Sequence, residues 1–287
     1  MLKYRLLYGT LMTLLFAGLV VLDGWLDGSL TISRADDKTT QGTILFILIG
    51  CLIIPSQLEL ARLAKAKNLR IFTPVTIIAS VLFAGAWYCQ ELIEIPPMIL
   101  VFFLSAFSLF GLLLYQYFRY GTSEVIANCG ASYFSITYIG LLSAFVLGIR
   151  IDFGLWPLLM FIFVVKSSDI GAYAIGSLFG KHKFSPKISP GKTWEGMAGA
   201  AVAGVIAGLL FAVCCGIMAW WSAVIFGICF AFIGQCGDLV ESMIKRDSEQ
   251  KDSSNKVPGF GGILDIIDSP LFAAPFAYLF FMFCATG

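Results

Sequence analysis

The chain has few charged residues and a single histidine. Asp, Glu, Lys and Arg make up 13% of its 287 residues, and the one histidine is His182. A soluble globular domain carries about 25% charged residues, so this composition excludes an ordinary water-soluble fold. A mechanism built on a histidine base has little support, because His182 lies in a loop among lysines.

Cysteine is present but is not arranged for metal binding. The chain has 8 cysteines and no Cys-x-x-Cys pair, and most of the cysteines fall inside apolar segments. Free thiols in such surroundings behave as small apolar side chains. A zinc site is therefore not expected.

Long apolar segments dominate the rest of the chain, in which 59% of the residues are hydrophobic. A helix of about 20 residues crosses about 30 Å of hydrocarbon. Segments of that length lie near residues 6–26, 42–60, 71–90, 97–117, 129–148, 154–178, 196–214, 219–240 and 263–284. The sequence therefore predicts an all-α polytopic integral membrane protein with about nine transmembrane helices and basic cytoplasmic loops.

The positions of Lys and Arg predict the orientation of these helices. Only Arg34, Lys38 and Arg150 fall on one side of the membrane, whereas the other side carries Lys3, Arg5, Arg62, Lys65, Lys67, Arg70, Arg119, Lys181, Lys183, Lys187, Lys192, Lys245, Arg246, Lys251 and Lys256. By the positive-inside rule, the N-terminus and the basic loops face the cytoplasm, and an odd number of spans puts the C-terminus outside. We expect a multi-pass protein of the cell (inner) membrane, with a first helix that is retained because no small-residue cleavage site follows it.

Polar residues enter the expected spans mainly in the second half of the chain. We therefore divide it into an N-terminal transmembrane region (1–122) and a C-terminal transmembrane catalytic region (123–287). In the first region, Asp23 and Asp27 are expected to reach the membrane interface. Residues 56–67 are expected to leave the bilayer as a basic amphipathic stretch, which either attracts anionic headgroups or only fixes the topology.

Charged side chains interrupt the sixth expected span. Asp169 and Tyr173 are four residues apart and share a helix face. They are candidates for a polar site that reaches into the membrane. As an alternative, Lys166 and Asp169, at a spacing of three residues, form an intramembrane ion pair with a structural role only.

The loop that follows carries lysines, hydroxyls and turn formers. Gly191-Lys192-Thr193 resembles the end of a P-loop, but Pro186 stands where the first glycine is required and no strand precedes the loop. What remains is a candidate anion site, made by Lys192, the Thr193 hydroxyl and the backbone amides of a turn that enters a helix. Ser189 or Thr193 is expected to cap that helix.

Carboxylates mark the junction of the last two expected spans. On helices, Asp238, Glu241 and Ser242 share one face, and Asp265 and Asp268 share another. Carboxylates at membrane depth are expensive, which indicates that something charged binds there. Two helices that present carboxylates to each other form an oxygen site suited to Mg²⁺, which keeps water and substrate phosphates as its other ligands.

Three classes of protein fit such charges. An enzyme that binds a metal and phosphates is one. An ion-coupled transporter, in which the same carboxylates bind Na⁺ or H⁺, is as well supported by the charges alone. A membrane scaffold is the third, and it predicts that Asp265→Asn leaves function untouched.

At these residues the chain resembles the phosphatidate cytidylyltransferase family, also called CDP-diacylglycerol synthases. The family signature is matched, in order and spacing, at Ser242, Lys245, Arg246, Lys251, Asp252, Pro258, Gly261, Gly262, Asp265 and Asp268. Two upstream family segments are matched at Asp169, Ala172, Tyr173, Gly176, Ser189, Pro190, Lys192 and Thr193. The resemblance covers roughly residues 160–287. Phe260 and Ile266 depart from it, since the family has His and Arg at these positions.

The resemblance implies a nucleotidyltransferase that moves CMP from CTP to phosphatidic acid, giving CDP-diacylglycerol and pyrophosphate for phospholipid synthesis. It implies Mg²⁺ with a second cation such as K⁺, both substrates and membrane lipids as partners, no nucleic acid, and a homodimer. Asp238, Asp265 and Asp268 are expected to hold the metal and, with Lys245 and Arg246, to form the catalytic group. The expected substrate-binding residues are Lys192, Thr193, Ser189, Ser242, Lys251, Asp169 and Tyr173. The ordered spacing across residues 242–268 favours this enzyme over the transporter.

Overall fold

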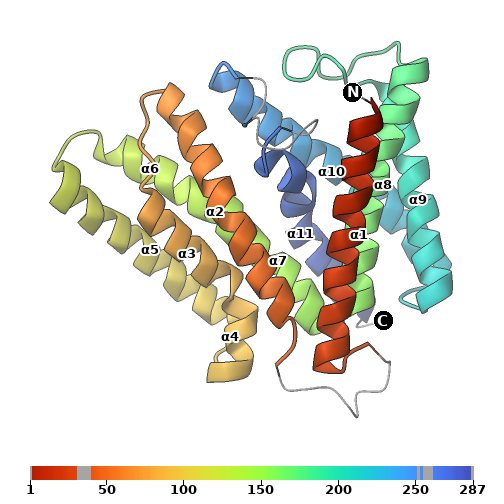
Figure 1. The fold of residues 1–287 in the computed structure, drawn as a ribbon, viewed down its shortest axis with the longest axis horizontal. Coiled ribbons are helices and arrows are strands. Elements are labelled where there is room, and N and C mark those ends of the chain that lie inside the picture. Colours follow the sequence, from red (N-terminus) through yellow and green to blue (C-terminus); the bar gives the residue numbers. More distant parts are fainter. Residues whose placement is uncertain (1, 31–39, 251–252, 255–260, 286–287) are drawn as a thin grey trace.

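The fold is an assembly of long helices. The computed structural model describes residues 2–30, 40–250, 253–254 and 261–285, without the side chains of residues 2–10, 91 and 285. Its helices are α1 (Leu2–Asp27), α2 (Thr43–Ala66), α3 (Thr73–Ala84), α4 (Ala86–Ile93), α5 (Pro97–Tyr120), α6 (Val125–Ser135), the π-helix η2 (Ile136–Leu141), α7 (Leu142–Gly148), the π-helix η3 (Ile149–Phe153), α8 (Leu155–Phe179), α9 (Trp194–Cys215), α10 (Trp220–Asp247) and α11 (Leu264–Ala285) (Figure 1). The all-α class is confirmed.

Within the described residues, seven helical segments are long and apolar enough to cross a membrane. These are 43–66, 97–120, 125–153, 155–179, 194–215, 220–247 and 264–284. The chain is thus a polytopic membrane protein, but the expected count of nine is not confirmed. The predicted third span, 71–90, is divided at Gly85 into α3 and α4, and the 12 residues of α3 are fewer than the roughly 20 that a span needs.

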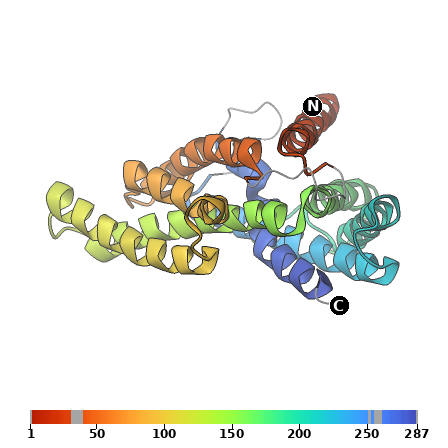
Figure 2. The same ribbon diagram turned by 90° about the horizontal axis from the view of Figure 1, so that it is seen from below.

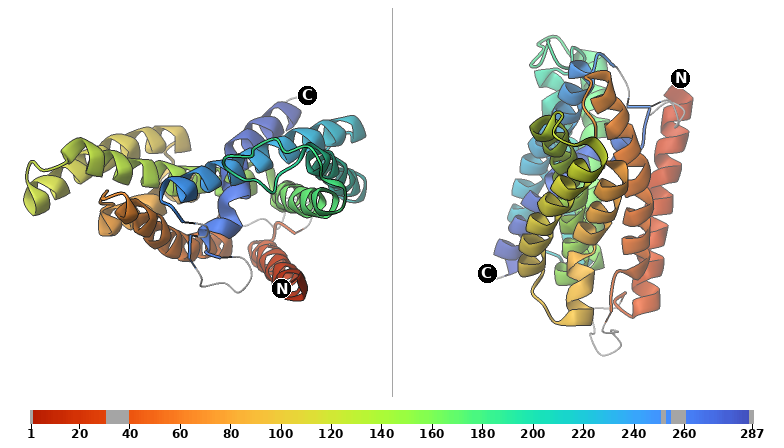
Figure 3. Two further views of the ribbon diagram at one scale, coloured as in Figure 1. Left: turned by 90° about the horizontal axis from the view of Figure 1, so that it is seen from above. Right: turned by 90° about the vertical axis from the view of Figure 1, so that its left-hand side faces the viewer.

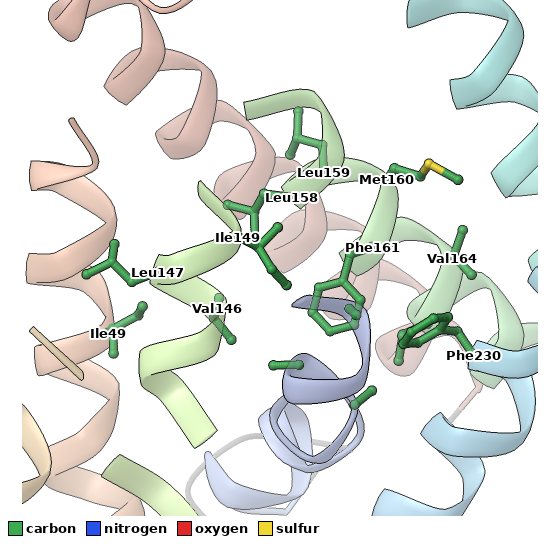
Figure 4. Close-up of a cluster of buried hydrophobic side chains, with 14 of the residues drawn as sticks. Ile49, Val146, Leu147, Ile149, Leu158, Leu159, Met160, Phe161, Val164 and Phe230 are labelled. Carbon is green, nitrogen blue, oxygen red and sulfur yellow. The ribbon is translucent and has the colours of Figure 1, made fainter. Parts of the chain in front are cut away.

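The helices form two wings that meet at a shared core. Helices α2–α6 lie in one wing and α8–α11 in the other, as seen end-on in Figure 2 and in the left view of Figure 3. In the second wing, α8 packs against α9, α9 against α10, and α10 against α11, while α11 also contacts α7. The core at the junction includes Ile49, Leu147, Leu158, Phe161 and Phe230 (Figure 4). Because this core joins both wings, it sets the position of α11 relative to α2.

A buried ion cluster fastens α1 to the rest of the protein at the end opposite the N-terminus (Figure 1). Arg150 is 0% exposed, and its guanidinium lies 2.7 Å from Asp27 and 3.4 Å from Asp23. Asp23 also accepts a hydrogen bond from the backbone of Ile44 at 2.7 Å. The expectation that Asp23 and Asp27 reach the membrane interface stays a prediction, but both carboxylates are buried in the protein against a cation from η3.

Several elements come together at the other end of the molecule. The N-terminus, the C-terminal ends of α2, α8 and α10, and the loop between α8 and α9 all lie there (Figure 1). Helix α11 begins at this end and runs back through the core. The segments on which the candidate site residues were placed therefore meet in space, although they span residues 166–268 in the sequence.

Candidate functional site

The site is built around carboxylates from two spans. One oxygen each from Asp238, Glu241 and Asp268 lies within 4.8 Å of the others. Glu241 and Asp268 are buried, at 0% and 3% exposed. Helices α10 and α11 approach closely because Gly237 has no side chain: a Cβ there would meet the Cβ of Phe272 at 2.8 Å. The prediction that Asp238 and Asp268 converge from separate spans is confirmed, and Glu241 joins them.

Asp265 has different surroundings from Asp268. It accepts hydrogen bonds from Lys245 at 2.5 Å, from the backbone N–H of Gly262 at 2.6 Å, and from the hydroxyl and backbone N–H of Ser253 at 2.8 and 3.1 Å. It does not belong to the three-carboxylate cluster of the described residues. Lys245 also donates to Glu241 at 2.6 Å, so Asp265 is tied to the cluster through a lysine. Its predicted role as a metal ligand stays a prediction.

The basic loop reaches the cluster through one lysine. Lys192 Nζ lies 2.7 Å from Asp238 and donates to the backbone carbonyl of Gln235 at 3.0 Å. The Thr193 hydroxyl accepts a hydrogen bond from the N–H of Gly196 at 3.1 Å, so Thr193 caps α9. The predicted anion-binding lysine is thus held beside the carboxylates, at the point where the loop enters a helix.

Helix α8 adds a second polar contact to this group. Asp169 accepts a hydrogen bond from Gln235 of α10 at 3.1 Å and lies 3.5 Å from Lys166. Lys166 also donates to the backbone carbonyl of Ile266 at 2.8 Å. The expected Lys166–Asp169 ion pair is therefore present, and both members also contact the helices that carry the site.

The other predicted site residues lie around this centre. The Ser242 hydroxyl is 3.5 Å from Asp238, and Arg246 donates to the backbone carbonyl of Ile188 at 3.3 Å, which ties the basic loop to α10. Ser189 lies in that loop and is half-buried, whereas the Tyr173 side chain on α8 is 55% exposed. Lys251, Asp252, Lys256, Pro258 and Phe260 lie outside the described residues.

Glu59 is a site residue that the sequence analysis missed. It is 0% exposed and accepts hydrogen bonds from the hydroxyls of Ser253 and Ser254 at 3.2 and 2.8 Å and from the N–H of Leu264 at 3.0 Å. Glu59 thus caps α11 from α2 and holds the segment that donates to Asp265. The expectation that residues 56–67 leave the bilayer as an amphipathic stretch overlooked this contact. An acidic residue among apolar ones near the end of an expected span was the available signal.

Gly262 completes the contact with Glu59. A Cβ at this position would collide with the Ser253 hydroxyl and with the Glu59 carboxylate. The preceding Gly261 has a φ of 97°, which side chains rarely adopt. The two glycines therefore allow the chain to turn tightly before α11, against the Glu59 side chain of α2.

The donors of the cluster suit a hard divalent cation. Asp238, Glu241 and Asp268 supply carboxylate oxygens, which Mg²⁺ prefers. One oxygen of Glu241 is buried without a hydrogen-bond partner among the described residues, and a buried orphan of this kind is costly. Lys192 and Lys245 border the cluster. Carboxylates that bind a cation and lysines that bind phosphate therefore lie side by side.

These features define a membrane protein with a charged carboxylate and lysine site at one end of its helices. Residues 38–284 match the sequence model of the cytidylyltransferase family. This match covers most of the chain, which therefore belongs to the cytidylyltransferase family.

Three curated relatives carry the name phosphatidate cytidylyltransferase. The protein of Mycobacterium bovis is 42% identical over 124 residues, which are 43% of this chain and 40% of the relative. That of Haemophilus influenzae is 41% identical over 135 residues, 45% of this chain and 47% of the relative. That of Brucella suis is 40% identical over 128 residues, with the same coverage of both chains. The chain thus spans about half or less of the length of these relatives.

Proposed function

We propose that the protein is a phosphatidate cytidylyltransferase, which transfers CMP from CTP to phosphatidic acid and releases pyrophosphate. The observation that carries this proposal is the cluster of Asp238, Glu241 and Asp268 with Lys192 and Lys245 at its border, in a chain of the cytidylyltransferase family. The names of the relatives agree with it. The transporter alternative finds no support in the family or in the relatives.

The proposed reaction requires that the protein position the two substrates and neutralise the charge of their phosphates. A phosphate oxygen of phosphatidic acid is already anionic and attacks the α-phosphorus of CTP. The bond from the α-phosphorus to the bridging oxygen breaks, and pyrophosphate leaves with the electron pair. No protein nucleophile or strong base is required, so the lysines bind and orient the phosphates and offset their charge. We assign this role to Lys192, Lys245 and Arg246, and the family resemblance extends it to Lys251.

Asp238, Glu241 and Asp268 would hold the divalent cation. Bound there, Mg²⁺ supplies neutralisation of the α-phosphate and of the leaving pyrophosphate. Asp265 then fixes Lys245 and the loop before α11, and Asp169 supports α10 through Gln235. The same proposal includes a second cation such as K⁺. Ser242, Thr193 and Ser189 orient the substrates, and Tyr173 contacts one of them.

The location of the site supports a cytoplasmic active centre in the inner membrane. Basic residues such as Arg62, Lys181 and Arg246 belong to elements at the end of the molecule that carries the site, and basic ends face the cytoplasm. In this orientation CTP arrives from the cytoplasm, and the lipid enters sideways from the inner leaflet. We further propose a homodimer that acts on membrane lipid and does not bind nucleic acid.

Radiolabelled CTP tests this function directly. Purified protein is incubated with labelled CTP, phosphatidic acid and Mg²⁺, and lipid-linked label is measured across several lipid phosphates. We expect label on phosphatidic acid that depends on the divalent ion. Absence of lipid-linked label with every divalent ion and every lipid phosphate would overturn the proposal.

A further inference from the structure

Lys166 is a charged residue in the interior of a membrane-spanning helix, α8. A charge at such a position is costly and needs partners within the protein. Its ammonium lies 3.5 Å from Asp169, one turn further along α8, and donates a hydrogen bond of 2.8 Å to the backbone carbonyl of Ile266 in α11. The shorter of these two contacts is thus with a neutral carbonyl of another helix.

The Ile266 carbonyl is available because of a proline in α11. In an α-helix the carbonyl of residue i accepts the N–H of residue i+4, which for Ile266 is position 270. Pro270 lies inside α11 and has no backbone N–H. A carbonyl without a donor is unfavourable within a membrane. Lys166 therefore supplies from α8 the donor that α11 itself lacks.

The same segment of α11 carries Asp268. This residue is 3% exposed, and its Oδ1 accepts hydrogen bonds from the backbone N–H of Ser269 at 2.6 Å and from the Ser269 hydroxyl at 3.3 Å. Ser269 immediately precedes Pro270. Because the carboxylate is bonded to the backbone beside the proline, a shift of this backbone moves the carboxylate relative to Asp238 and Glu241.

Helix α10 also packs closely on this segment. A Cβ at Gly237 would lie 2.8 Å from the Cβ of Phe272 and 3.1 Å from the carbonyl oxygen of Asp268. Close packing at a glycine sets the distance between α10 and α11 but brings no side-chain donor. The hydrogen bond from Lys166 adds a directional contact with α8, so residues 266–272 are held by two helices.

We propose that Lys166 is a positioning residue, which donates to the carbonyl that Pro270 leaves free and thereby holds Asp268 in the carboxylate cluster. This inference rests on the cation site of the proposed function and is independent of which substrates the enzyme takes. It gives Lys166 a role that an ion pair with Asp169 does not provide.

Restoring the N–H at position 270 tests this role. Lys166→Met removes the donor with little change in side-chain volume, and Pro270→Ala returns a backbone N–H that can bond to the Ile266 carbonyl within α11. Pro275→Ala is the matched control, because Pro275 also lies inside α11 but its position serves the carbonyl of Leu271. The three single variants and the two double variants that contain Lys166→Met are purified in nanodiscs.

Two quantities are measured for each protein. Electron paramagnetic resonance gives the Mn²⁺ affinity, and mass spectrometry gives hydrogen exchange in the first two turns of α11 without added metal. We expect Lys166→Met to weaken Mn²⁺ binding about fivefold to tenfold, as the loss of one charged hydrogen bond does, and to accelerate exchange.

The double variants separate the positioning role from an ion pair. Adding Pro270→Ala to Lys166→Met should bring Mn²⁺ affinity and exchange to within about twofold of Pro270→Ala alone, since the helix then satisfies its own carbonyl. Adding Pro275→Ala should leave both quantities impaired. A lysine that served only to pair with Asp169 would be rescued by neither substitution.

Three results would overturn the inference. They are Mn²⁺ affinity of Lys166→Met within twofold of the unchanged protein, no recovery with Pro270→Ala, and no Mn²⁺ binding by the unchanged protein. The failure of the proposed reaction has a separate signature. Mn²⁺ binding that Pro270→Ala restores, without lipid-linked label from CTP in the unchanged protein, would refute the reaction and keep the positioning residue.

Discussion

Two carboxylates at the start of α11, Asp265 and Asp268, have different surroundings. Asp265 and Asp268 are three residues apart, but only Asp268 lies in the cluster with Asp238 and Glu241. Asp265 accepts hydrogen bonds from Lys245, Ser253 and Gly262. A carboxylate satisfied by one cation and several N–H and O–H donors is a good positioning group, whereas one facing other carboxylates needs a cation.

Asparagine substitutions distinguish the metal-binding role of Asp268 from the positioning role of Asp265. Asp268→Asn should weaken Mn²⁺ binding by more than about tenfold and leave thermal stability unchanged or higher, because it removes one of several like charges. Asp265→Asn should cost about 1.5–3 kcal/mol of stability through its charged hydrogen bonds, with a smaller effect on Mn²⁺. Mn²⁺ titration and thermal unfolding of the two variants provide the comparison.

The reverse pattern would restore the assignment made from the sequence. If Asp265→Asn lost Mn²⁺ binding as strongly as Asp268→Asn and kept its stability, Asp265 would be the metal ligand and Glu241 would not.

The choice between these carboxylates marks the limit of prediction at the residue scale. Helical spacing placed Asp238 with Glu241 on one face, and the expectation that two helices present their carboxylates to each other correctly joined Asp268 to them. The same spacing treats Asp265 and Asp268 as equivalent. They differ because of Ser253, Gly262 and Glu59, which act from an irregular segment and from a distant helix, and no periodic pattern reports such contacts.

At the scale of elements, α2 determines where α11 begins. The N–H of Leu264 and the two serine hydroxyls all donate to the Glu59 carboxylate. A capping acceptor that comes from another helix couples the two helices, because α11 cannot shift along its axis without losing it.

Glu59→Gln tests this coupling. The amide replaces one accepting oxygen with a donor that faces N–H and O–H groups, so we expect a loss of about 1–3 kcal/mol and faster hydrogen exchange in α11's first turn. Exchange measured by mass spectrometry reports the position of the effect. Glu94→Gln, at an exposed residue after α4, is the control. Unchanged exchange in the first turn of α11 would refute the capping role.

The elements themselves were largely predictable. Each expected apolar segment lies on one helix or on two or three consecutive helices. The break at Gly85 was missed because hydropathy is continuous across it, although Gly85 faces Phe46 closely enough that a Cβ would lie 3.0 Å from the ring. The π-helices η2 and η3 were missed as well, because one additional residue in a turn does not change the hydropathy of an apolar segment.

At the scale of the whole molecule, charge is buried at both ends of the helices for different reasons. At one end the carboxylates face one another beside two lysines. At the other end Arg150 is enclosed by Asp23 and Asp27, with Ser29 accepting a further hydrogen bond from it at 2.7 Å. At the first end, Glu241 Oε1 has no hydrogen-bond partner among the described residues. At the second end, Asp23 Oδ2 and Arg150 Nε also lack one, but they lie 3.4 Å apart as an ion pair.

Arg150→Met should therefore affect stability and not the site. It leaves two carboxylates buried without their cation, which costs about 3–5 kcal/mol, while Mn²⁺ affinity of the folded fraction stays within about twofold. Denaturant unfolding in detergent measures the loss. Arg119→Met, at an exposed position near the end of α5, should change stability little. A stable Arg150→Met variant with impaired Mn²⁺ binding would contradict this separation.

The Arg150 cluster also constrains the order in which the protein is made. The residues Asp27 and Arg150 are separated by 123 positions along the chain. While the ribosome is still adding α2–α7, the carboxylates at the far end of α1 have no guanidinium to neutralise them. The ion cluster is therefore complete only after residue 150 has been added, although Asp23 and Asp27 already have partners in the backbone N–H groups of Ile44 and Gly42.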